Sequence, residues 1–96
     1  MSDDKNEILI KALVTASIQE ALLAFGQPVY EEAIKALKKE YNCYISDCYE
    51  HPEYLNQVLK TLFGSSSQVI SKKIEKELAE FISRKSINNF LILINE

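Results

Sequence analysis

The chain contains few of the residues that turn a backbone or stop a helix. It has only two glycines and two prolines among 96 residues. A sheet protein needs many turn residues, whereas helices joined by short connections need few. The apolar fraction of 47% and the charged fraction of 26% are ordinary for a globular domain. We therefore expect one all-α domain over residues 1–96, with its core at about 4–84 and an extension at 86–96.

Arginine and net positive charge are also scarce. The net charge is −3, and Arg84 is the one arginine among eleven basic residues. A nucleic-acid-binding protein normally presents a basic face, and arginine is its main tool for reading bases. The sequence therefore disfavours nucleic acid as a partner. Weak nucleic-acid binding through lysine-rich helix faces is the alternative, and it would use Lys35, Lys38, Lys39, Lys72, Lys73 and Lys76.

The N-terminal sequence MSDDKNE is acidic and polar. A secretory segment would begin with positive charge, so we expect a cytoplasmic protein. Asp3 and Asp4 are suited to cap the first helix. The many lysine, glutamate and isoleucine residues hint at a thermophile, although ten asparagine and glutamine residues weaken this hint.

The stretch from Ile8 to Phe25, ILIKALVTASIQEALLAF, is apolar at nearly every angle of a helix. Its polar residues Lys11, Gln19 and Glu20 argue against a membrane span. Such a helix is predicted to be surrounded by other helices. Its apolar residues form two rows that would face different neighbours. One row is Leu9, Leu13, Ala16 and Leu23, and the other is Ile10, Val14, Ile18, Ala21 and Phe25.

Stop signals and periodicity divide the chain into four main helices. Gly26 and Gly64 end helices, and Pro28 and Pro52 begin them. In the fourth helix, Ser65 to Ser67 supply capping hydroxyls, and the inward residues are Val69, Ile70, Ile74, Leu78, Phe81 and Ile82. The predicted ranges are about 4–25, 28–42, 52–63 and 67–84, followed by a helical extension near 87–94.

A short motif occurs twice, because Phe25-Gly26 and Phe63-Gly64 each precede a turn and a new helix. This repeat predicts two helical hairpins packed face to face as a four-helix bundle-like array. The layout resembles an EF-hand pair. The turns GQP and GSSS lack the alternating carboxylates of a calcium loop, so no calcium is expected.

The loop at 43–51 contains two thiols and the one histidine, spaced C-x4-C-x2-H as Cys43, Cys48 and His51. A zinc site needs a fourth ligand, and only Asp47 and Glu50 lie nearby in the sequence. Catalysis by Cys48 with His51 would also need an orienting group and a pocket. We expect an ordinary loop with buried thiols, a possible Cys43–Cys48 disulfide, and no metal, cofactor or catalytic residue.

All five tyrosines fall between residues 30 and 54. They either form a recognition surface or cover the core beside the long loop. In the tail, a helix would align Ile87, Phe90, Leu91 and Ile94 and leave Ile92 and Leu93 over. A monomer or weak homodimer is expected, with the tail as its contact. The candidate interaction surface is Tyr44, Tyr49, Tyr54, Phe90, Ile92 and Leu93.

The segments FGQPVYEEAIKALKKEY and HPEYLNQVLKTLFGSSSQVISKKIEKELAEF resemble a small all-helical output-type domain of archaea. That family occurs alone or attached to sensory and response-regulator-like proteins. The similarity covers about residues 7–84 and leaves out the tail. It implies a helical bundle with a signalling or protein-interaction role, and it transfers no catalytic residue.

Overall fold

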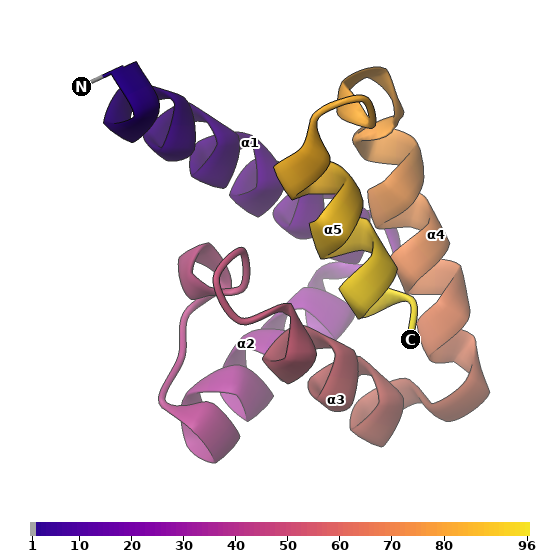
Figure 1. Ribbon diagram of the computed structural model, residues 1–96. Coiled ribbons are helices and arrows are strands. Elements are labelled where there is room, and N and C mark those ends of the chain that lie inside the picture. Colours follow the sequence, from indigo (N-terminus) through magenta and orange to yellow (C-terminus); the bar gives the residue numbers. More distant parts are fainter. Residues whose placement is uncertain (1) are drawn as a thin grey trace.

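Residues 2–96 fold into five α-helices. The computed structural model describes the backbone of residues 2–96 and the side chains of residues 7–96. Single-turn 3-10 helices occur at Ile45–Asp47 (η1), Gly64–Ser66 (η2) and Ala79–Phe81 (η3), and residues 2–96 contain no strand. The predicted all-α fold is confirmed. The helices are α1 (Ser2–Ala24), α2 (Gln27–Tyr41), α3 (Pro52–Phe63), α4 (Ser67–Glu77) and α5 (Lys85–Ile94), as Figure 1 shows.

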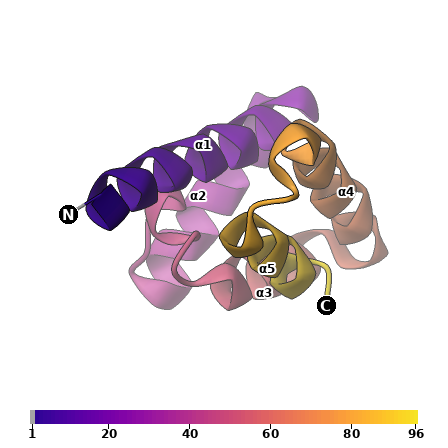
Figure 2. The same ribbon diagram turned by 45° about the horizontal axis from the view of Figure 1, so that its top comes forward.

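The first four helices form a ring of two hairpins. Helix α1 packs against α2 and α4, and α3 packs against the same two helices from the other side. Helices α2 and α4 therefore lie across the ring from one another (Figure 1). Helix α5 packs mainly on α3, which Figure 2 shows from another side. The predicted array of two helical hairpins is thus correct.

Two glycines end helices where they were expected. Gly26 has φ of +122° and Gly64 has φ of +56°, and side chains other than glycine rarely adopt either conformation. Pro28 and Pro52 then stand in the first turns of α2 and α3. The predicted serine caps are wrong, because Ser65 to Ser67 continue through η2 into α4 without a side-chain cap. The side chains of Asp3 and Asp4 lie outside the described residues.

The fourth helix is shorter than predicted. It ends at Glu77 instead of residue 84, and the backbone tightens into η3. Val69 and Ile82 were predicted to face inward, but they are 56% and 46% exposed. The early end lets the chain turn back, so that α5 can pack on α3. The tail is then a complete helix whose buried residues are Ile87, Phe90, Leu91 and Ile94.

Helix α1 is covered on one side only, so the prediction that other helices surround it is wrong. The row containing Val14 and Ile18 is buried except at its end, Phe25, and the side chains of Val14 and Ile18 are fully hidden. The opposite row is open, and Leu9 is 67% exposed. A chain of 96 residues has too few helices to enclose a helix of 23 residues on all sides.

Candidate functional site

An apolar groove lies where the two hairpins turn. Its volume is about 320 Å³, and one lining residue, Ser66, is polar. We call it the turn groove. The first hairpin contributes Phe25 and Val29, and the second contributes Phe63, Ser66, Val69 and Ile70.

The turn groove is open to solvent although it is mostly hydrocarbon. Phe25 is 42% exposed and Val69 is 56% exposed, while Ile70 is buried beneath them. Phe25 and Phe63 each directly precede a glycine that ends a helix, so both rings lie at the turn end of their hairpin. This exposed apolar hollow is a candidate interaction site. Sequence reasoning missed the groove because it assigned Phe25 and Val69 to core rows, although the repeated Phe-Gly motif was a usable signal.

The predicted tyrosine surface is largely used within the chain. Tyr54 stacks between the ring of Tyr41, at a centroid distance of 4.3 Å, and the ring of His51, at 4.7 Å. These stacks connect the end of α2 to the start of α3 across the loop. They make Tyr54 a half-buried cover of the core.

Tyr44 and Tyr49 also have partners in the chain. The Lys38 Nζ lies 4.5 Å from the Tyr44 ring centroid and donates a hydrogen bond of 3.1 Å to its hydroxyl. The Tyr49 hydroxyl donates to Glu7 Oε1 at 3.5 Å. Burial raises the pKa of the Tyr49 hydroxyl above its usual value. Of the three tyrosines predicted as a surface, only Tyr44 is mainly exposed.

The tail residues divide between core and surface. Phe90 was included in the candidate surface, but it is 2% exposed and belongs to the core, because the helical stripe of α5 turns it onto α3. Ile92 and Leu93 lie outside the buried stripe of α5 and are exposed, as predicted. The Leu93 carbonyl accepts a hydrogen bond of 2.9 Å from Asn56 Nδ2, which fixes the tail to α3.

The two thiols are buried and free, and both lie beside one carbonyl. Cys43 Sγ is 3.3 Å and Cys48 Sγ 3.8 Å from the oxygen of Tyr44. Burial raises the pKa of both thiols, and the charge of Asp47 raises it further. Neither is therefore a ready nucleophile at neutral pH. The structure contains no Cys43–Cys48 bond, and the disulfide stays a prediction.

His51 takes no part in a thiol site. Its ring stacks on Tyr54, and its Nδ1 lies 3.2 Å from Glu53 Oε2 at the surface. Within the described part of the chain, no three His, Cys, Asp or Glu side chains are grouped so that they could hold a metal ion. The spacing C-x4-C-x2-H is thus not assembled into a ligand set.

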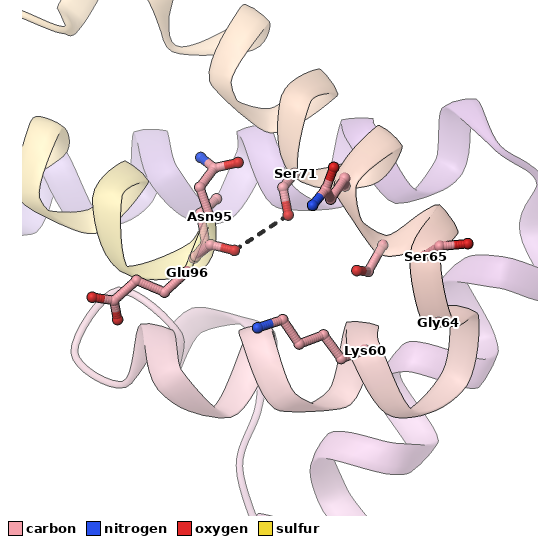
Figure 3. A pocket seen from close by; sticks show the side chains of 9 residues that line it. Lys60, Gly64, Ser65, Ser71, Asn95 and Glu96 are labelled. Atoms are coloured by element: carbon pink, nitrogen blue, oxygen red, sulfur yellow. Dashed lines mark hydrogen bonds between the residues drawn. The ribbon is translucent and has the colours of Figure 1, made fainter.

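A polar pocket of about 280 Å³ lies between α3, the start of α4 and the C-terminal residues. Figure 3 shows Lys60, Ser71 and Glu96 around it, and Ser71 Oγ donates a hydrogen bond of 3.3 Å to the Ile94 carbonyl. Its lining contains no thiol and no imidazole. The pocket therefore does not join a nucleophile to a histidine base of the kind that hydrolytic enzymes use.

The lysines of the nucleic-acid alternative do not form one face. Three of them lie on α2 and three on α4, across the ring (Figures 1 and 2). Lys72 lies 3.6 Å from Glu75, and Lys73 lies 3.5 Å from Glu77, so carboxylates offset part of their charge.

Comparisons with protein-family models, with curated proteins and with solved structures found no match to this chain. The resemblance to an archaeal output-type domain therefore stays a prediction. Among the described helices, none has the length and apolar character needed to cross a membrane.

Proposed function

We propose that this chain is a non-enzymatic protein-interaction module that binds an apolar segment of a partner protein in the turn groove. The observation that supports the proposal is the open hydrocarbon lining of this groove, with Val69 56% exposed above Ile70. Covering apolar surface contributes roughly 25 cal/mol per Å² to binding before the costs of association. Aromatic and aliphatic side chains set in such a hollow commonly carry most of the binding energy.

The groove suits the apolar stripe of a partner helix. Its volume of about 320 Å³ is at the lower end of ligand pockets and accommodates one or two large side chains. An amphipathic helix presents such side chains at positions i, i+3 and i+4, and helix-in-groove binding is a common mode of recognition. The interaction is regulatory in this proposal. We assign it to the cytoplasm of an archaeon, on the basis of the resemblance.

The test compares two adjacent substitutions on α4. Val69→Asp places a charge in the turn groove, whereas Gln68→Asp places the same charge on an exposed residue that lines the polar pocket instead. A partner captured from the native source is identified and then titrated against each variant. We expect Val69→Asp to weaken binding at least tenfold and Gln68→Asp to leave it within about twofold, with unchanged circular dichroism.

Other outcomes would contradict the proposal in distinguishable ways. Equal binding by both variants would exclude the turn groove as the contact. Binding of nucleic acid that weakens steeply with salt would favour the lysine faces instead. Turnover of a substrate that Cys48→Ser abolishes would identify an enzyme.

A further inference from the structure

The solvent side of α1 is apolar, which is unusual for the outer face of a helix in a globular protein. Between Ile8 and Ala24, only Gln19 and Glu20 are polar among its exposed residues. Ile8 and Leu9 are each 67% exposed, and Leu23 is 39% exposed. We call this surface the α1 outer face, and it consists of Ile8, Leu9, Ala12, Ala16, Gln19, Glu20, Leu23 and Ala24.

The spacing along this face is that of a coiled-coil seam. Leu9, Ala12, Ala16, Gln19 and Leu23 follow one another at alternating steps of three and four residues. The two leucines lie about 21 Å apart along the axis, and Ala16 lies midway between them. The side chains of the seam are therefore large at both ends and small in the middle. An antiparallel second copy would pack each Leu9 against Leu23 of the other chain, and the small central residue would let the helices approach closely.

The charges beside the seam also match a second copy. Arg84 lines a hollow of about 190 Å³ together with Leu9, Leu13 and Phe81, so this residue is next to the N-terminal half of the seam. Glu20 lies seven residues after Leu13 and hence on the same edge of α1. An antiparallel two-fold axis at Ala16 brings position 20 of one chain opposite position 12 of the other. Glu20 of each copy then lies beside Arg84 of its mate.

A parallel pair would not give these contacts. In a parallel pair, Glu20 of one copy would lie about 12 Å along the axis from Ala12 of the other copy. It would also lie on the opposite edge from Arg84 of that copy. From the seam and the charges together, we infer that the protein forms an antiparallel two-fold dimer through the α1 outer face. This contact uses neither the tail nor the turn groove, so it is independent of the proposed function.

Sedimentation equilibrium tests whether the dimer exists. The measured mass is expected to rise with concentration from 11.0 kDa toward twice that value. Ala16→Arg puts two like charges at the two-fold axis and should weaken dimerisation at least tenfold. Gln57→Arg adds the same charge at an exposed residue of α3, the helix across the ring from α1, and should leave dimerisation unchanged. A mass that stays at one chain up to millimolar concentration would refute the inference.

Oxidative cross-linking tests the orientation. Two copies of Ala16→Cys meet at the axis, whereas two copies of Ala12→Cys lie eight residues apart along the pair, or about 12 Å, beyond the reach of a disulfide. Ala16→Cys should form covalent dimers at least tenfold faster than Ala12→Cys. The native thiols are buried and should not compete. Equal cross-linking by both variants would indicate a parallel pair and overturn the orientation.

Charge reversal tests the predicted ion pairs. Glu20→Arg or Arg84→Glu alone should weaken the dimer several-fold because like charges then meet, and the double variant should restore it. Additive losses in the double variant would show that these residues do not face each other.

Discussion

The ring of Tyr54 lies flat on the ring of Tyr41, with centroids 4.3 Å apart and ring planes 9° from parallel. Tyr41 ends α2 and Tyr54 lies in the first turns of α3, so this one contact holds together the two ends of the loop at 42–51. The buried thiols lie within the same loop, where Cys48 is fully hidden. The stack therefore fixes the longest connection between the first four helices within residues 2–96.

Tyr54→Ala should destabilise the protein by about 2 kcal/mol, because it removes both ring stacks and part of the core cover. Tyr44→Ala is the matched control, since its ring is 59% exposed and should cost less than about 1 kcal/mol. Urea unfolding gives both free energies of unfolding. Equal losses for the two variants would show that the stack does not stabilise the loop.

Ile18→Ala should lower the free energy of unfolding by about 2–5 kcal/mol, because Ile18 is fully buried on the inner side of α1. Leu9→Ala on the opposite row of the same helix should change it by less than about 0.5 kcal/mol in dilute protein. Denaturant titration of both variants measures the asymmetry. A large loss for Leu9→Ala would mean that the outer row is covered.

The sequence was sufficient to predict the helices, because their signals are local. The glycine and proline positions placed most boundaries, and the predicted tail stripe of Ile87, Phe90, Leu91 and Ile94 is the buried face of α5. The end of α4 was missed because no glycine or proline lies between residues 65 and 84. The backbone break at Leu78 depends on tertiary packing, which local propensity does not encode.

The candidate surfaces were harder to predict than the helices. Both rows of α1 are apolar, so periodicity could not decide whether the row of Ile18 or the row of Leu9 would be buried. Only a few helices are available to pack against α1, so the covered row is decided by tertiary packing. Similarly, the clustering of tyrosines suggested a recognition surface, but the rings of Tyr41 and Tyr54 stack on one another within the chain.

Stability should fall as the pH rises above about 8.5, where thiols of an unfolded chain begin to ionise. Burial raises the pKa of Cys43 and Cys48, so the folded chain keeps protons that the unfolded chain releases. Higher pH then favours unfolding, and the stability present below about pH 8.5 is lost toward the folded pKa values. Each thiol that stays protonated contributes about 1.4 kcal/mol of loss per pH unit.

Cys48→Ser provides the control for this pH effect. Its free energy of unfolding should decline less steeply than that of the native chain between about pH 9 and 10. Unfolding curves at several pH values give the two slopes. Identical slopes would mean that Cys48 ionises equally in the folded and unfolded chains.

The tail should behave as part of the core, although it lies outside the predicted core range. Phe90→Ala should cost about 3–5 kcal/mol, because its ring is 2% exposed on the face of α5 that packs on α3. Ile92→Ala, on the same helix but 55% exposed, should cost less than about 0.5 kcal/mol. Thermal unfolding of a variant that lacks residues 86–96 should likewise show a strong loss of stability. If the shortened chain unfolds at the native temperature, α5 contributes nothing to the core and its buried stripe has another role.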